Sequence, residues 1–117
     1  MGSLTTHVLD LVSGQPAAGM AIELAAVEGG VRRMIVKTTT NPNGRCDGAL
    51  LDGDRFTAGV WQLEFHVAKY FAAKGVPLAK PPFLDIVTVR FGVANPGEHH
   101  HVPLLVTPWS YSTYRGS

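Results

Sequence analysis

The sequence predicts an all-β sandwich of two antiparallel sheets with one short helix. Three observations lead to this class. Apolar and polar residues alternate over short segments, clusters of Gly, Pro and Asn separate these segments, and only one stretch changes to helical spacing. A chain of 117 residues, 45% of them hydrophobic, has the size and composition of one globular domain. We therefore expect a single domain over residues 1–117.

The predicted strands follow this alternation in chain order. The six segments are Leu4 to Val12, Met20 to Glu28, Val31 to Thr40, Gly59 to Val67, Asp85 to Val93 and His99 to Thr107. The pair Gly29-Gly30 indicates a tight hairpin, because glycine adopts the positive φ that such turns require. The run Asn41-Pro42-Asn43-Gly44 marks another turn.

One stretch departs from the two-residue rhythm of the strands. Val67, Tyr70 and Phe71 stand at i, i+3 and i+4, and Gly75 follows as a stop signal. This spacing predicts a short helix whose Tyr70 and Phe71 side chains seal it onto the sheet.

The last predicted strand has two apolar faces. Alternation assigns to its core face His100, Val102, Leu104 and Val106. It assigns to its outer face His99, His101, Pro103, Leu105 and Thr107. If Val8 of the first strand points inward, His7 and Leu9 lie on a similar outer face. A patch of this kind indicates an interface or a ligand groove, and a symmetry mate covering it would form a closed oligomer with a cleft between subunits.

Charge, cysteine content and termini exclude several classes of protein. The net charge of +1, without a basic block, argues against a nucleic-acid partner. Cys46 is the only cysteine, so no intrachain disulfide forms and a reducing compartment fits best. We find no signal peptide, no apolar run long enough to span a membrane and no usual peroxisomal tripeptide, so we expect a soluble cytoplasmic protein without a membrane partner. Trp61 and Trp109 are expected to pack in the core.

Four motifs occur in order along the chain. They are His7-Val8-Leu9-Asp10, Asn43-Gly44-Arg45, His101-Val102-Pro103-Leu104-Leu105 and the ending Tyr111-Ser112-Thr113-Tyr114-Arg115-Gly116-Ser117. Together they resemble the transthyretin-related 5-hydroxyisourate hydrolases over essentially the whole chain. The ending Tyr114-Arg115-Gly116-Ser117 separates those enzymes from transthyretin itself.

The resemblance implies a transthyretin-like (prealbumin-like) sandwich that assembles as a homotetramer with active sites at the dimer–dimer interface. It implies hydrolysis of 5-hydroxyisourate to 2-oxo-4-hydroxy-4-carboxy-5-ureidoimidazoline in urate degradation, with no cofactor or metal. The catalytic residues carried over are His7, Arg45 and His101, and the substrate-binding residues are Ser117 and Tyr114.

Ordinary chemistry assigns a role to most of these residues. A histidine with a pKa near 6.5 accepts a proton from water at neutral pH, and the sequence leaves open whether His7 or His101 is this base. Arg45 is suited to binding an oxyanion, because its planar charge is permanent. Ser117 offers a hydroxyl and, as the last residue, an α-carboxylate, and we expect it to position the substrate rather than act as a nucleophile.

Three other interpretations compete with the hydrolase. A transthyretin-like carrier would bind a hydrophobic ligand in the same channel, but a pocket with two histidines and an arginine is too polar for that. An adhesion module would be secreted and monomeric, but a last strand that is apolar on both faces indicates that another molecule covers its outer face. His99 and His101 share a face and form at most a weak zinc site, because a structural zinc site needs three or four converging ligands.

Overall fold

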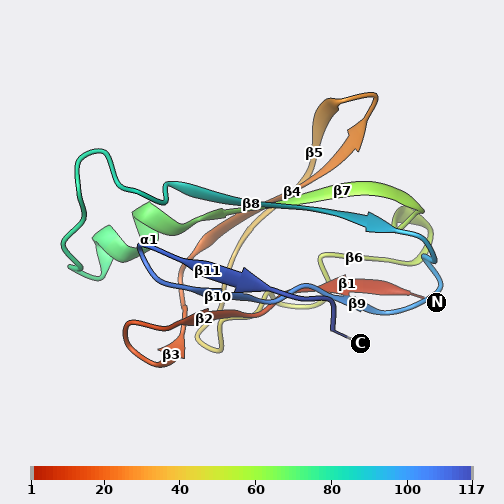
Figure 1. The fold of residues 1–117 in the computed structure, drawn as a ribbon. Coiled ribbons are helices and arrows are strands. Elements are labelled where there is room, and N and C mark those ends of the chain that lie inside the picture. The colour runs from red at the N-terminus through yellow and green to blue at the C-terminus, as the bar shows by residue number, and fades with distance from the viewer. Residues whose placement is uncertain (1, 117) are drawn as a thin grey trace.

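The computed structural model describes residues 2–116 and folds them into two β layers packed face to face (Figure 1). The first layer is an antiparallel sheet with the strand order β5-β4-β7-β8. Its strands are β4 (Ala21–Glu28), β5 (Val31–Thr39), β7 (Gly59–His66) and β8 (Ile86–Val93). Both the first and the last residue of each of these four strands lie within one residue of the bounds of a predicted segment. The alternation therefore located this layer correctly.

The second layer consists of two short sheets, with strand orders β6-β1-β9 and β11-β10-β2-β3. Its strands are β1 (Ser3–Thr5), β2 (Val8–Asp10), β3 (Gln15–Pro16), β6 (Leu51–Asp52), β9 (His100–His101), β10 (Leu104–Val106) and β11 (Tyr111–Thr113). The prediction of two antiparallel sheets fails in this layer, because β1 pairs with β9, and β2 with β10, in parallel. These partners come from opposite ends of the chain, so no hairpin imposes opposite directions on them.

Two segments predicted as single strands are each divided in the structure. The segment His99 to Thr107 forms β9 and β10, and the break contains Pro103, which has no N–H for the ladder. The segment Leu4 to Val12 forms β1 and β2. Between them the buried Thr6 hydroxyl donates a hydrogen bond of 2.7 Å to the Val102 carbonyl. The alternation of burial continues across the break in the first segment, whereas in the second it is interrupted by Pro103, which is buried although it was assigned to the outer face.

Strands β3, β6 and β11 were not predicted, and one core residue was assigned wrongly. All three residues of β11 are exposed, so the strand shows no alternation of burial. Trp109 is 60% exposed in the turn between β10 and β11, where its ring stacks on Phe83 at 5.9 Å between centroids. Trp61 is 5% exposed and lies in the core, as predicted.

The predicted hairpin and helix are both present. Gly29 and Gly30 join β4 to β5 with φ angles of +57° and +78°, which is the geometry of a two-residue hairpin turn. Helix α1 (Val67–Ala73) follows β7 directly and buries Tyr70 and Phe71. The Tyr70 hydroxyl donates a hydrogen bond of 2.8 Å to Asp10 Oδ2, which ties α1 to the second layer.

A 3₁₀ turn, η1 (Gly53–Arg55), completes the helical structure among the described residues. Within residues 2–116 no helix has the length and apolar character needed to cross a membrane.

The core lies between the layers, and the predicted core face of the last strand is confirmed. His100 is 5% exposed, and Val8 is fully buried. The largest fully buried side chains are Phe65, Phe71, Leu4, Met20, Ile22, Leu24, Leu63, Leu104, Val8, Val67 and Val106. Because Val8 points inward, His7 and Leu9 lie on the outer face of the second layer, beside the outer face of β9 and β10.

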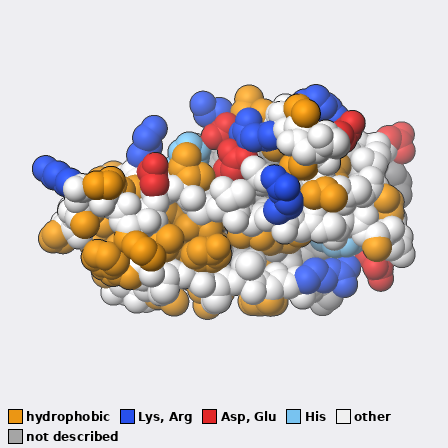
Figure 2. Space-filling model, turned by 45° about the horizontal axis from the view of Figure 1, so that its top comes forward, with side chains coloured by type: hydrophobic (Ala, Val, Ile, Leu, Met, Phe, Trp, Pro, Cys, Tyr) orange, Lys and Arg blue, Asp and Glu red, His pale blue; other side chains and the backbone are white. Residues whose placement is uncertain are grey.

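The outer face of the first layer carries a network of charged side chains. Arg32 contacts both Glu64 and Glu23, and Glu23 also accepts a bond of 2.7 Å from the His66 ring. Figure 2, which brings this face forward, shows acidic and basic side chains side by side near its middle and hydrophobic side chains toward one end. The charged side chains named here form ion pairs with one another, whereas the outer face of the second layer carries apolar side chains and histidines.

Candidate active site

The two predicted catalytic histidines meet on the outer face of the second layer because of the parallel pairing there. Thr5 of β1 is opposite His101 of β9, and Val8 of β2 is opposite Leu104 of β10. The same register continues across the break, where the Leu104 N–H donates to the His7 carbonyl at 2.9 Å. His7 and His101 are therefore close neighbours on one face although they come from opposite ends of the sequence.

A tight turn brings Arg45 to the same place. His7 and Arg45 form an isolated antiparallel bridge, and the Val8 N–H donates to the Gly44 carbonyl at 2.8 Å. The Asn41 side-chain oxygen accepts the N–H of Arg45 at 3.2 Å, which closes the turn. Gly44 has φ of +75°, and a Cβ there would lie 2.5 Å from the Val8 carbonyl oxygen. Only glycine lets this turn approach β2 so closely.

A pocket of about 400 Å³ opens at this point. Its lining residues are Thr5, Thr6, Arg45, Cys46, Gly48, His99 and His101. Cys46 is half-buried, and burial, followed by the charge of Asp47, raises the pKa of its thiol. A thiol in that state is a poor nucleophile. The polar groups of the pocket are thus an arginine, imidazoles and hydroxyls.

Burial and nearby charge lower the pKa of both histidines, of which His101 lines the pocket and His7 does not. Burial lowers the pKa of His7, the positive charge of Arg45 lowers it further, and a hydrogen bond with the Asn43 backbone opposes them. Burial also lowers the pKa of His101, followed by the charges of Arg45, His99 and His7. A neutral imidazole has a free ring nitrogen that accepts a proton, so either ring is suited to act as a base at neutral pH.

The structure adds three residues for which the sequence suggested no catalytic role. Thr5 Oγ1 lies 2.8 Å from His101 Nδ1 and 3.2 Å from His99 Nε2, and Ser3 Oγ lies 2.6 Å from His99 Nδ1. The rings of His99 and His101 stack with centroids 6.4 Å apart and an interplanar angle of 14°. The alternation Ser3-Leu4-Thr5 places both hydroxyls outward, but only the pairing of β1 with β9 makes them neighbours of the histidines.

The C-terminal segment packs against His101. The Gly116 N–H donates to the His101 carbonyl at 2.7 Å, and a Cβ on Gly116 would lie 3.2 Å from Cδ2 of the His101 ring. Tyr114 is 61% exposed and borders a separate hollow beside β8 rather than the histidine pocket. Ser117, the other predicted substrate-binding residue, lies outside the described residues.

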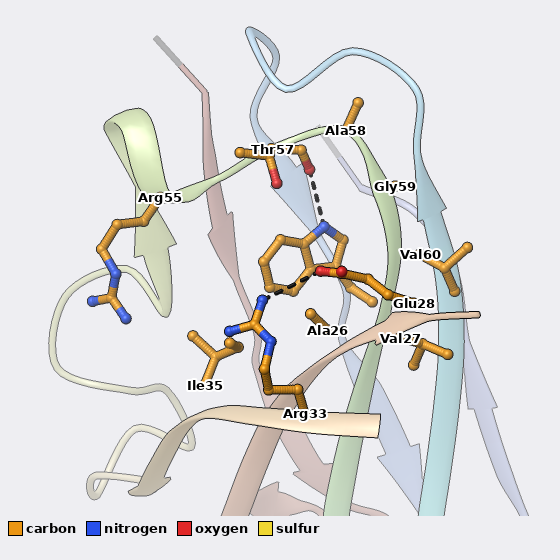
Figure 3. A pocket seen from close by; sticks show the side chains of 11 residues that line it. Ala26, Val27, Glu28, Arg33, Ile35, Arg55, Thr57, Ala58, Gly59 and Val60 are labelled. Atoms are coloured by element: carbon orange, nitrogen blue, oxygen red, sulfur yellow. Dashed lines mark hydrogen bonds and ion pairs between the residues drawn. The ribbon is translucent and has the colours of Figure 1, made fainter. Parts of the chain in front are cut away.

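A second concavity of about 410 Å³ lies beside the β4–β5 hairpin (Figure 3). The Trp61 indole donates a bond of 3.0 Å to the Thr57 carbonyl at this site, and Arg33 is paired with Glu28 at 3.3 Å. No histidine lines this concavity. Its size matches that of the histidine pocket, but its only carboxylate is Glu28, which is exposed and paired with an arginine, so we place the candidate chemistry at His7, Arg45 and His101.

Comparison with known proteins identifies the family of the chain. The HIUase/Transthyretin family matches residues 4–116. A 5-hydroxyisourate hydrolase of Ralstonia nicotianae is 54% identical over 117 residues, and the match covers 100% of both chains. A crystal structure of (S)-allantoin synthase matches 99% of this chain with a TM-score of 0.94 and 45% identity, and this chain spans 44% of that longer protein.

A structure of sea bream transthyretin in complex with thyroxine is a further match. Its TM-score is 0.86 at 29% identity, and the match covers 97% of this chain and 94% of the transthyretin chain. The predicted transthyretin-like fold is therefore confirmed. The fold, the match along nearly the whole sequence and the high identity of the relatives together show that the chain belongs to the HIUase/Transthyretin family.

Proposed function

We propose that this protein hydrolyses 5-hydroxyisourate to 2-oxo-4-hydroxy-4-carboxy-5-ureidoimidazoline in urate degradation. The observation that carries the proposal is the meeting of His7, Arg45 and His101 on one face, with the pKa of both imidazoles lowered. Relatives 54% identical from Ralstonia nicotianae and Pseudomonas aeruginosa carry the name 5-hydroxyisourate hydrolase, which supports the same substrate for this chain.

The reaction adds water across a ring amide of the substrate. A neutral imidazole, of His7 or His101, takes a proton from water while the water oxygen bonds to the ring carbonyl carbon. The carbonyl electron pair moves onto its oxygen and returns as the carbon–nitrogen bond breaks. The imidazolium then gives its proton to the leaving nitrogen, so that one water is consumed and the histidine is regenerated.

Arg45 stabilises the negative charge that develops on the carbonyl oxygen. The Asn41–Gly44 turn holds the Arg45 backbone beside His7, and Arg45 borders the pocket together with His101. A fixed cationic donor aimed at such an oxygen contributes a few kcal/mol of transition-state stabilisation, on the order of a hundredfold or more in rate. The substrate is rich in carbonyl oxygens, which a planar donor recognises well. Ser117 is the proposed substrate-positioning residue, whereas Tyr114 borders a separate hollow and has no role in this site.

We also propose that the protein acts as a cytoplasmic homotetramer with its sites at the dimer–dimer interface. The outer face of β2 and β10 supports this, because Leu9 and Leu105 lie there only partly covered. Leu11 and Val12 continue the apolar surface, with 51% and 53% exposure. A single chain rarely leaves such a continuous apolar surface in water unless another molecule covers it.

The direct test uses freshly generated substrate. 5-Hydroxyisourate is formed from urate by a urate-oxidising enzyme, and its ultraviolet absorbance is followed with and without this protein. We expect the decay to accelerate in proportion to protein concentration. A decay equal to the spontaneous rate would reject the assignment.

The transthyretin structure with thyroxine keeps a carrier function as the second candidate. The polar lining of the pocket, which includes Arg45, His99 and His101, disfavours a large aromatic ligand. Isothermal titration calorimetry with thyroxine separates the two functions. Tight binding of thyroxine by a protein that leaves 5-hydroxyisourate unchanged would favour the carrier.

A further inference from the structure

We propose that Thr5 is a positioning residue of this hydrolase, joining the rings of His101 and His99 through its hydroxyl and holding His101 with Nδ1 protonated and Nε2 unprotonated. The inference rests on the proposed hydrolytic function and extends it. It assigns Nε2 of His101 as the atom that takes the proton of the attacking water.

The hydroxyl imposes complementary roles on the two rings. Thr5 Oγ1 lies within hydrogen-bond distance of His101 Nδ1, at 2.8 Å, and of His99 Nε2, at 3.2 Å. A hydroxyl has one proton to donate. When both rings are neutral and both contacts are hydrogen bonds, one ring nitrogen donates to Thr5 and the other accepts from it. The protonation of one histidine is thus coupled to that of the other.

The position of Arg45 selects the direction in which the hydrogen bonds between His101, Thr5, His99 and Ser3 run. A guanidinium has only donors, and its positive charge favours a lone pair rather than an N–H group on the nitrogen that faces the pocket. Since Nδ1 of His101 is occupied by Thr5, the nitrogen left for the pocket is Nε2. The His101 Nδ1–H group then donates to Thr5, Thr5 donates to His99 Nε2, and the His99 Nδ1–H group donates to Ser3.

Packing holds the His101 ring in the orientation that this chain requires. The His99 ring stacks beside the His101 ring with an interplanar angle of 14°. The backbone of Gly116 lies so close to the His101 ring that a Cβ on Gly116 would be 3.2 Å from its Cδ2. The charged or titratable groups that influence His101 are Arg45, His99 and His7. The backbone carbonyl of His99 accepts a bond of 3.2 Å from Arg115.

The chain also stabilises the charge formed during the reaction. When Nε2 accepts a proton from water, His101 becomes an imidazolium whose Nδ1–H donates more strongly to Thr5. Thr5 in turn donates more strongly to His99, which spreads the charge toward the exposed end of the chain at His99 and Ser3. Thr5, His99 and Ser3 keep their own protons throughout, because His101 returns the proton it accepted to the leaving nitrogen of the substrate.

The kinetic test compares a substitution that removes the hydroxyl with one that keeps it. Thr5→Val removes the hydroxyl and keeps the branched shape, whereas Thr5→Ser keeps the hydroxyl. We expect Thr5→Val to lower kcat by about 10- to 100-fold with a much smaller change in KM, as is typical when the partner that orients a functional histidine is removed. Thr5→Ser should recover most of the lost turnover. Circular dichroism and size-exclusion chromatography confirm that both variants fold and assemble as the parent does.

A second measurement does not depend on activity. Nitrogen-15 NMR of histidine-labelled protein distinguishes protonated from unprotonated ring nitrogens at a pH where both rings are neutral. We expect His101 of the parent protein to show a protonated Nδ1 and an unprotonated Nε2, and Thr5→Val to shift the ring toward the opposite tautomer. His99→Phe keeps the stacked ring and removes its nitrogens, and it should reproduce part of the Thr5→Val effect on kcat.

Specific results overturn the proposal. A protonated Nε2 in the parent protein would contradict the assigned direction, and equal kcat for Thr5→Val and Thr5→Ser would contradict the role of the hydroxyl. Failure of the hydrolase assignment has a different signature, namely a parent protein that leaves the decay of 5-hydroxyisourate unchanged. In that event the NMR result still decides whether Thr5 sets the tautomer of His101.

Discussion

The candidate site depends on three side chains whose charge states follow from where they are held. His7 and His101 are partly buried and lie near the permanent charge of Arg45, so both lose the imidazolium form more readily than free histidine. The guanidinium of Arg45 is the cation of the set. The residues therefore divide into proton acceptors and a fixed cation, which is the combination that hydrolysis of a cyclic amide requires.

Removing the cation or the imidazole should abolish most of the activity. We expect His101→Ala and Arg45→Ala each to lower kcat/KM for 5-hydroxyisourate by about a hundredfold or more, because one removes a proton acceptor and the other the oxyanion partner. Arg33→Ala is the matched control, since Arg33 is an exposed arginine of the β4–β5 hairpin in the other layer and does not line the histidine pocket. Equal losses in all three variants would contradict the assignment.

The influence of Arg45 on His101 should be visible in a titration. Burial and then the charge of Arg45 lower the pKa of His101, so we expect the ring to lose its proton at a lower pH than a free histidine does. Removing the cation removes part of this effect. We expect the pKa of His101, measured by proton NMR, to rise in Arg45→Gln relative to the parent protein. An unchanged or lower pKa would show that Arg45 does not act on this ring.

At the scale of elements, the site depends on one turn and on two parallel strand pairs. The Asn41–Gly44 turn brings Arg45 to His7, and the β1–β9 and β2–β10 pairs bring both ends of the chain together. Helix α1 supports this layer from the opposite side, because Tyr70 bonds to Asp10 at the end of β2. Asp10 is 3% exposed, so the bond is shielded from water.

The Tyr70–Asp10 bond should contribute measurably to stability. Burial alone would raise the pKa of Asp10, but hydrogen bonds from Tyr70, Ser13 and Val12 outweigh burial and lower it. We expect Tyr70→Phe to reduce the free energy of unfolding by about 1–3 kcal/mol, because a buried carboxylate oxygen loses its donor. Urea unfolding at fixed protein concentration near pH 7 measures the loss.

The pH dependence supplies the control for this prediction. A carboxylate whose pKa is lowered in the folded protein stabilises the fold above its unfolded pKa, and this contribution disappears as the pH falls through the folded value. The difference between Tyr70→Phe and the parent protein should therefore shrink in acid. A difference that grows as the pH falls from 7 toward 3 would refute this account.

At the scale of the whole molecule, the two layers have different outer faces. The first layer is covered by paired charges, whereas the second layer presents apolar side chains around the histidine pocket. Figure 1 shows the second layer as a set of short strands with the ends of the chain at one side of it. The proposed tetramer covers this second layer and leaves the charged one in water.

A charge placed on the apolar outer face should break the assembly. We expect Leu105→Glu to convert the tetramer to smaller species in sedimentation velocity and to lower activity, because burying an unpaired carboxylate in an interface is costly. The circular dichroism spectrum should stay unchanged, since Leu105 faces outward. Val31→Glu, a substitution at a position that is 68% exposed on the hairpin of the other layer, serves as the control and should remain tetrameric.

Local patterns of the sequence determined much of the fold. The alternation located all four strands of the first layer within one residue, the spacing at Val67 located α1, and Gly29-Gly30 located the hairpin. These features depend on backbone geometry over a few residues, which the sequence expresses directly. The motifs also identified His7, Arg45 and His101, the residues that the structure brings together.

Tertiary structure alone decided what local patterns do not contain. The parallel direction of β1 and β9, the exposed position of Trp109 and the chain of hydrogen bonds from Ser3 through His99 and Thr5 to His101 all depend on contacts between distant segments. Alternation states which face a residue occupies but not which strand lies beside it or in which register. The residues of the candidate site are therefore visible in the sequence, whereas the geometry that makes them a site arises only when the two ends of the chain pair.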